Sequence, residues 1–397
     1  MSTGGFQKGQ IMDKSLYLRG LMPDREENIA LESPKKPLYR SALYISIAVY
    51  FFLLSINLIS TSFSLMGSEI AESIIMATAN PFVGLFIGLI ATAILQSSST
   101  VTAMTIAAVA GSSISFESAI PIIMGANVGT TITSTIVSLG FMPKKVEFRK
   151  AISAGTAHDI FNILVVIILF PLEIKFQFLS KLSTFIGSLT EVSSGEQGSS
   201  PLALGFNSYL FEPVANLMAN LISNPYVLLL ISFSLLFGMI KLLSNLIYKE
   251  LIGRSRSKFE DFVFKSKFKS FGWGTLITAM IQSSSVTTSL IVPLVATRKI
   301  SLRQAFYFIM GANIGTTITA LIAATFRSEA AIYLAIAHLM FNLIGVLIFL
   351  PFPILSRIPI RIAKKLGAAT LNNRIVGFAY IIMVFFLLPF LLIYLSS

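Results

Sequence analysis

QSSS at residues 96–99 returns unchanged at residues 282–285, an offset of 186 residues (282 − 96). Around it, residues 88–136 align without a gap to residues 274–322, and 24 of the 49 aligned positions are identical. A polar, glycine-punctuated segment that occurs twice in an apolar chain is typical of membrane transporters, which build a site between internal repeats. The sequence therefore predicts two repeats and one site shared between them.

Two further motifs are repeated. MGAN-x-GTT at 124–131 returns at 310–317 with the same offset. AHDIFN at 157–162 pairs with AHLMFN at 337–342, and both histidines of the chain lie in this pair. Asp159 has no acidic counterpart, because leucine takes its place in the second copy. The two copies are therefore similar but not equivalent.

The composition is that of a membrane protein. Of the 397 residues, 54% are hydrophobic and 12% are charged, about half the charged fraction of a globular chain. A helix needs about 20 apolar residues to cross the hydrocarbon layer. Seven segments meet this requirement: 40–62, 118–139, 151–171, 226–248, 302–326, 329–351 and 375–395. We expect an all-α polytopic membrane protein with no cleavable signal peptide.

The basic residues are unevenly distributed, and this predicts an orientation. Five segments hold 26 of the 30 Lys and Arg residues: 1–40, 140–150, 249–270, 298–303 and 357–374. Four others hold only three of them: 63–80, 112–117, 172–225 and 326–330. The positive-inside rule places the first group, and the N-terminus, in the cytoplasm. It also explains the net charge of +12 without a nucleic-acid partner.

Equivalent loops in the two copies differ in their content of basic residues: where one copy has many, the other has few. Residues 63–80, before the first QSSS, have no basic residue, whereas 249–270, before the second, have seven. The bias also flips after each motif, so we expect inverted-topology repeats with discontinuous helices that carry QSSS. Each QSSS segment is either a re-entrant hairpin or, alternatively, a full crossing beside a re-entrant segment at 118–139.

These patterns predict the domain organisation. The expected parts are a cytoplasmic arm (1–39), a first repeat (40–171), an extracytoplasmic connecting loop (172–225), a second repeat (226–351), and a basic loop with a last transmembrane helix (352–397).

The hydroxyls of the QSSS segments suit a small oxyanion. Serine caps helix N-termini, and a helix beginning there would present free N–H groups and about half a positive charge. Seven residues are candidates for the substrate site: Ser97, Ser98, Ser99, Thr100, Ser283, Ser284 and Ser285. The alternative is that these residues only pack between helices. With no Lys or Arg near either motif, a bound anion would depend on a cation bound with it.

Amide and hydroxyl oxygens nearby suit Na⁺, a hard cation that transporters bind at helix breaks. Six residues are candidates: Gln96, Gln282, Asn127, Thr130, Asn313 and Thr316. The GxxxG spacing beside the asparagines has a simpler explanation, which is close helix contact.

Three ionisable residues inside apolar segments are candidates for coupling: His158, Asp159 and His338. A neutral histidine bonded to a carbonyl is the alternative for both histidines. Asp159 alternatively lies near the cytoplasmic end of its span.

These motifs resemble the type II sodium-phosphate cotransporter family, as a prokaryotic member. The resemblance rests on both QSSS motifs, the stretch 120–131, HD-FN at 158–162 and the basic stretch 357–367. It implies a symporter, not an enzyme, that imports inorganic phosphate with Na⁺ by alternating access and needs no cofactor. It also implies the substrate and sodium residues named above.

The departures from the family pattern refine the expectation. The connecting loop is short and the chain has no cysteine, which indicates a bacterial inner-membrane protein. We also expect the C-terminus to lie outside the cytoplasm. Lys144 stands where electrogenic members have aspartate. Two alternatives remain: a symporter of sulfate or a dicarboxylate, and an anion channel or sensor. The sequence predicts no oligomeric state.

Overall fold

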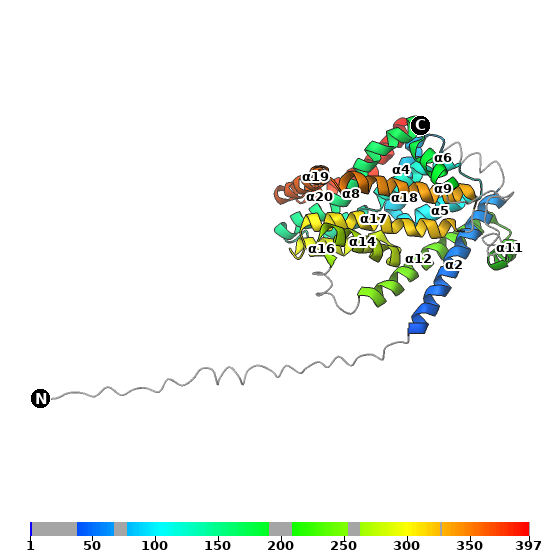
Figure 1. Cartoon of the computed structure of the whole chain (residues 1–397), viewed down its shortest axis with the longest axis horizontal. Coiled ribbons are helices and arrows are strands. Elements are labelled where there is room, and N and C mark those ends of the chain that lie inside the picture. Colours follow the sequence, from blue (N-terminus) through cyan, green and yellow to red (C-terminus); the bar gives the residue numbers. More distant parts are fainter. Residues whose placement is uncertain (2–37, 67–77, 190–208, 253–262, 326–327, 397) are drawn as a thin grey trace. The chain divides into compact units, whose positions relative to one another are not determined.

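The structure, a computed structural model, describes residues 1, 38–66, 78–189, 209–252, 263–325 and 328–396. Every regular element in these ranges is a helix (Figure 1). Residues 43–397 form one compact unit, which holds all the repeated motifs. The expected arm at 1–39 falls almost wholly outside the described residues. The all-α prediction is confirmed.

The helices before the C-terminal ones fall into two series, each of which contains one QSSS motif. The first series is α2 (Leu38–Leu65), α4 (Pro81–Leu95), α5 (Ser98–Ala110), α6 (Phe116–Gly129), α7 (Ile132–Leu139), α8 (Lys145–Phe176) and α9 (Phe178–Leu189). The second is α11 (Glu212–Leu221), α12 (Pro225–Ile252), α14 (Lys267–Ile281), α15 (Ser284–Ser289), α16 (Ile291–Ala296), α17 (Leu302–Ala324) and α18 (Glu329–Phe349). The chain ends with α19 (Pro353–Asn372), α20 (Ile375–Ile382), the π-helix η1 (Met383–Leu387) and α21 (Leu388–Ser396).

Several of these helices can cross a membrane. Five are long and apolar enough: Leu43–Phe63, Phe116–Leu139, Leu302–Ala324, Glu329–Phe349 and Ile375–Leu395. The pair α8 and α9 also qualifies, with a bend of 79° between them. These helices coincide with six of the seven expected spans, and the seventh, 226–248, lies within α12. The chain is therefore a polytopic membrane protein, as predicted.

Each QSSS motif interrupts an apolar helix. In the first series α4 has 15 residues and α5 has 13. In the second, α14 has 15 residues and is followed by the apolar stretch Ser284–Ala296. At 1.5 Å per residue each piece is about 20 Å long, too short for hydrocarbon about 30 Å thick. The helices are thus discontinuous at QSSS, and a re-entrant path for them stays a prediction.

Much of the expected connecting loop is helical instead. Helix α8 continues to Phe176, and α9 and α11 lie within 172–225. The helix breaks at Gln177, where φ is 51°, and restarts because the buried Glu173 carboxylate accepts hydrogen bonds from the backbone N–H groups of Leu179 (2.7 Å) and Ser180 (3.3 Å). The expectation of a loop was wrong for these stretches. The start of α9 was not predicted, because its cap comes from Glu173, which lies six and seven residues before the N–H groups that it accepts from.

The glycines of the second motif bring helices into close contact. Helix α6 packs on α4, and α17 packs on α14 in the same way. A Cβ added at Gly125 would lie 1.8 Å from the backbone oxygen of Leu85, and one at Gly311 would lie 2.0 Å from that of Phe271. Only glycine permits such an approach. Close helix contact therefore explains these glycines, and both copies use it.

Candidate functional site

Both QSSS motifs fold into the same sharp turn. Gln96 ends α4 and Gln282 ends α14, each in left-handed backbone with φ of 53° and 56°. The next residue begins a new helix, because the hydroxyls of Ser97 and Ser283 accept hydrogen bonds from the N–H three residues on, at 3.2 and 3.3 Å. A left-handed residue followed by a capping serine lets the chain end one helix and start another within two residues.

The two turns meet and exchange hydrogen bonds. The Ser99 hydroxyl donates to the backbone oxygen of Gln282 at 3.1 Å. In return, the Ser285 hydroxyl donates to the backbone oxygen of Gln96, also at 3.1 Å. The structure therefore brings together the two motifs, 186 residues apart, as a reciprocal pair.

The middle serine of each motif is left for another partner. Ser98 and Ser284 are buried, with 4% and 3% of their surfaces exposed. Neither hydroxyl bonds to any residue that the structure describes, whereas the first serine of each motif caps a helix and the third reaches the other motif. A hydroxyl that no protein group engages can donate to and accept from a ligand, so these two are the serines of the motifs best placed to bind one.

The remaining candidates in the motifs differ between the copies. The Thr100 hydroxyl is paired with that of Ser97 at 2.8 Å. The Gln96 side chain is exposed, whereas Gln282 is buried and its Oε1 lacks a hydrogen-bond partner in the described part of the chain. Gln282 is thus the glutamine better suited to coordinate a cation.

A chain of hydrogen bonds links the second and third motifs across the two copies. His158 Nε2 lies 2.8 Å from Asn313 Oδ1. The Asn313 amide nitrogen donates to Asn162 Oδ1 at 2.6 Å, and that of Asn162 donates to the backbone oxygen of Asn127 at 2.7 Å. Since Asn313 presents its oxygen to the histidine, Nε2 is the protonated nitrogen.

The second histidine makes the matching contact. His338 Nε2 lies 3.3 Å from Asn127 Oδ1, which also accepts a hydrogen bond from the Asn342 amide nitrogen at 3.1 Å. Each histidine therefore contacts the asparagine of the other copy. Both partners are side-chain amides rather than backbone carbonyls. Asn162 and Asn342 were not among the predicted site residues, although both stand at the shared last position of the repeated hexapeptides.

Asp159 lies in the interior. It has no exposed surface, the Thr135 hydroxyl donates to its Oδ2 at 2.9 Å, and Tyr380 of α20 lies against the same carboxylate. A position near the cytoplasmic end of its span stays a prediction. A coupling role for Asp159, His158 and His338 stays a prediction.

The threonines chosen as sodium ligands keep free lone pairs. The hydroxyls of Thr130 and Thr316 donate to the backbone oxygens of Ala126 (3.0 Å) and Ala312 (2.9 Å), one turn earlier in each helix. A hydroxyl that donates its hydrogen can still offer its oxygen to a cation.

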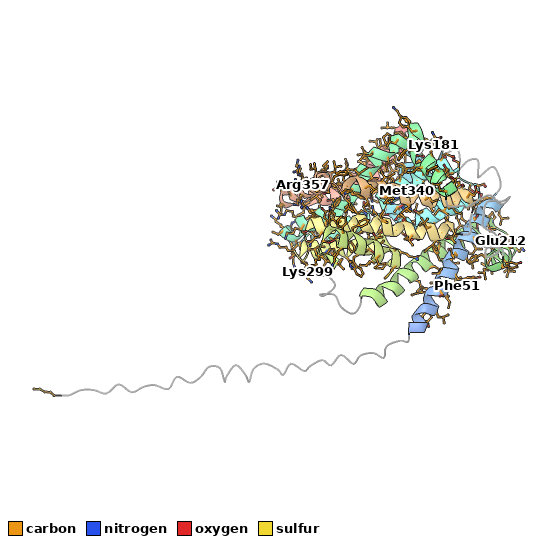
Figure 2. The ribbon with its side chains drawn as sticks, in the orientation of Figure 1. Phe51, Lys181, Glu212, Lys299, Met340 and Arg357 are labelled. Atoms are coloured by element: carbon orange, nitrogen blue, oxygen red, sulfur yellow. The ribbon has the colours of Figure 1, made fainter. Side chains whose placement is uncertain are left out.

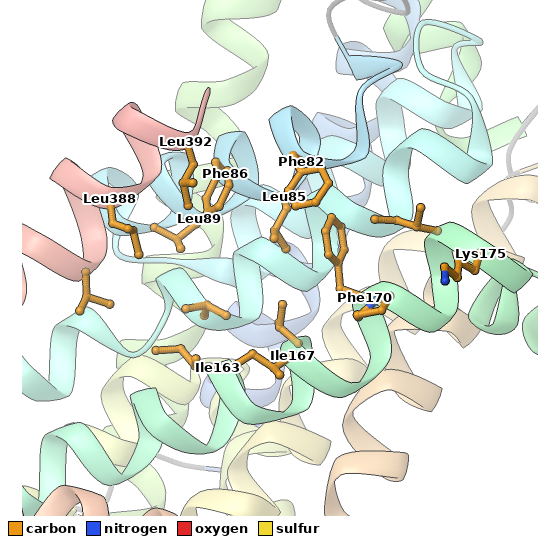
Figure 3. A pocket seen from close by; sticks show the side chains of 15 residues that line it. Phe82, Leu85, Phe86, Leu89, Ile163, Ile167, Phe170, Lys175, Leu388 and Leu392 are labelled. Atoms are coloured by element: carbon orange, nitrogen blue, oxygen red, sulfur yellow. The ribbon is translucent and has the colours of Figure 1, made fainter. Parts of the chain in front are cut away.

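A large cavity lies elsewhere. About 630 Å³ in volume, it opens between α4, α8 and α21 and is lined by apolar side chains such as Phe86, Phe170 and Leu388, with Lys175 at one end (Figure 3). Hydrocarbon offers an anion almost no hydrogen bonds, so we do not assign the substrate to this cavity.

A family model described as Na⁺/Pi-cotransporter matches residues 51–191 and 234–386, so each matched part contains one QSSS motif. The chain belongs to the Na⁺/Pi-cotransporter family. The resemblance predicted from the repeated motifs is thereby confirmed, and the family consists of transporters rather than enzymes.

Curated relatives in this family include two named transport proteins. Sodium-dependent phosphate transport protein 2A of Mus musculus is 29% identical over 416 residues, which cover 86% of this chain and 65% of that protein. Sodium-dependent phosphate transport protein 2B of Homo sapiens is 28% identical over 437 residues, 86% of this chain and 63% of that protein. The chain thus spans less than two thirds of the length of either. No solved structure matches it.

Proposed function

We propose that this member of the Na⁺/Pi-cotransporter family is a symporter that imports inorganic phosphate with Na⁺ across the plasma membrane by alternating access. The observation that carries the proposal is the reciprocal pairing of the two QSSS turns, in which the Ser98 and Ser284 hydroxyls have no partner among the described residues. The relatives' names supply the substrate and the coupling ion.

The turns suit phosphate binding. Their hydroxyls are neutral donors, and the N-terminus of the 13-residue helix α5 adds the positive end of a helix dipole. No lysine or arginine hydrogen-bonds to either motif in the described chain. A multivalent anion there needs co-bound cations, and this dependence is the physical basis of coupling. We assign phosphate to Ser97, Ser98, Ser99, Thr100, Ser283, Ser284 and Ser285.

We assign the sodium sites to Gln96, Gln282, Asn127, Thr130, Asn313 and Thr316. Gln282 and the two threonines have free oxygen lone pairs. The Asn127 and Asn313 oxygens face histidines, so a cation there would compete with the histidine for the asparagine. Sodium binding at these residues would therefore change the hydrogen bonds that link the two copies.

The contacts also support inverted repeats, and the distribution of basic residues favours an N-terminus in the cytoplasm. Three of the basic segments meet in one pocket, which contains Lys150, Arg298 and Lys364. Two of the segments poor in basic residues, 112–117 and 172–225, meet elsewhere at Tyr333, whose hydroxyl lies 3.5 Å from the carboxylate of Glu329 in a third such segment, 326–330. The rings of Phe116 and Tyr333 lie 6.3 Å apart, and a Cβ at Gly187 would lie 2.3 Å from the Tyr333 ring. Segments grouped by charge are thus grouped in space. We propose a bacterial inner membrane, with the C-terminus outside.

Uptake of radiolabelled phosphate into proteoliposomes tests the function. With an inward Na⁺ gradient we expect uptake at least about tenfold faster than with K⁺ in its place, because the anion binds poorly without Na⁺. Equal uptake with K⁺ would contradict coupling and indicate a channel. Excess unlabelled arsenate should compete, and competition by sulfate or a dicarboxylate instead would show that the symporter carries another anion.

A further inference from the structure

A second pocket, which no QSSS residue lines, collects positive charge. It has a volume of about 850 Å³ and is lined from α8, from the corner between α16 and α17, and from α19. Six of its lining residues are cationic: Arg149, Lys150, Arg298, Lys299, Arg303 and Lys364. The lining residues that the structure describes include no acid. Such a pocket attracts a multivalent anion.

The corner between α16 and α17 does not need these charges to fold. Arg298 adopts left-handed backbone with φ of 65°, and the Ser301 hydroxyl caps α17 by accepting from the Gln304 N–H at 3.2 Å. The matched corner of the first copy has the same conformation, with Ser112 at φ of 58° and Ser115 as the cap. There Ser112, Ser113 and Glu117 stand at the positions of Arg298, Lys299 and Arg303. The cations thus belong to the second copy alone and serve something other than the turn.

Like charges are crowded in the pocket. The guanidinium groups of Arg149 and Arg298 lie close enough to repel the Lys150 ammonium. Glu147 is the acid near Lys150, but its carboxylate lies 3.4 Å from the ammonium of Lys144. The N-terminus of the 23-residue helix α17 adds the positive end of its dipole at the pocket wall. A bound anion would relieve this repulsion.

Helix α19 indicates where the anion comes from. It contributes Lys364 to the pocket, and it exposes the aliphatic stripe Ile354 (75% exposed), Ile358 (40%) and Ile362 (43%). An exposed apolar stripe on a basic helix is typical of a helix that lies at the membrane surface. Figure 2 shows Arg357 of α19 and Lys299 toward the same end of the molecule, away from Glu212. Basic pockets between such helices suit phospholipid headgroups.

We propose that this pocket binds the phosphate headgroup of an anionic phospholipid, with the acyl chains beside the isoleucine stripe of α19. The site is distinct from the transport site and faces the side of the membrane where the basic segments gather.

Thermal unfolding of the full-length purified protein in a neutral detergent tests the proposal. Short-chain phosphatidylglycerol should raise the Tm, whereas phosphatidylcholine and sodium pyrophosphate at equal concentration should not. In the double variant Arg298→Gln and Lys364→Gln, the lipid concentration for half of the Tm rise should increase at least about tenfold, since each cation near an anionic lipid contributes several-fold in affinity. The charge-preserving double variant Arg298→Lys and Lys364→Arg should restore binding.

A matched control removes equal charge outside the pocket. Lys265→Gln with Lys269→Gln neutralises two exposed residues that do not line it, and this variant should keep the wild-type response. An equal loss in the control would overturn the proposal in favour of diffuse surface attraction. No Tm rise with phosphatidylglycerol in the wild type would also overturn it. A rise with pyrophosphate alone would replace the lipid by a soluble phosphate.

Discussion

Replacing Ser98 and Ser284 together by alanine should lower kcat/KM for phosphate uptake by at least about 100-fold. A hydrogen bond to a charged group contributes about 1.5–3 kcal/mol, and each variant removes one such donor from the anion. The fold should survive, because neither hydroxyl bonds to a residue that the structure describes. Sodium-driven uptake into proteoliposomes measures the loss, with the amount of inserted protein determined in parallel.

The single variants Ser98→Ala and Ser284→Ala should raise the KM for phosphate by about the same factor as each other, since both hydroxyls face one anion. Ser62→Ala is a suitable control, because Ser62 is equally buried but donates to the backbone oxygen of Leu58 at 2.7 Å, far along the chain from either motif. Its uptake should match the wild type. Kinetics within twofold of wild type in the Ser98 and Ser284 variants would remove both serines from the substrate site.

Gly274→Ala should leave little folded protein. Its Cβ would lie 2.1 Å from the backbone oxygen of Phe308, so α14 and α17 would have to separate. We expect a loss of more than about 3 kcal/mol in the free energy of unfolding, a large part of the 5–15 kcal/mol typical of a native protein. The Tm of detergent-purified protein and the yield of monodisperse material measure the effect.

The same helix supplies the matched control. Gly272 lies two residues earlier in α14, and a Cβ there would meet nothing within 4 Å. Gly272→Ala should keep or raise the Tm, because alanine is favoured over glycine in a helix by about 1 kcal/mol. An unchanged Tm for Gly274→Ala would show that the two helices do not pack as described.

The sequence predicted the helix breaks and the meeting of the two QSSS motifs because both follow from local chemistry and duplication. Serine after an apolar helix is a strong cap, and a motif that occurs twice at one spacing implies equivalent folds. The distinct tasks of three adjacent serines could not be predicted. They depend on the left-handed turn at Gln96 or Gln282 and on a partner motif 186 residues away.

The asparagines show a second limit of prediction from the sequence. An amide next to hydroxyls suits Na⁺, but it suits a histidine equally well, and only the fold shows that His158 faces Asn313 while His338 faces Asn127. Helix α9 was missed for a similar reason. Its start depends on Glu173, a charged residue that looks like part of a loop but is buried as a cap.

Equilibrium binding of phosphate to the purified protein tests the central claim most directly, because the two QSSS turns should form one site in two halves. In excess Na⁺ we expect one phosphate per chain by isothermal titration, and in K⁺ we expect affinity at least about tenfold weaker. Two phosphates per chain would mean that each motif binds alone, and equal affinity in K⁺ would mean that the site does not need sodium. Either result would contradict the shared, sodium-dependent site.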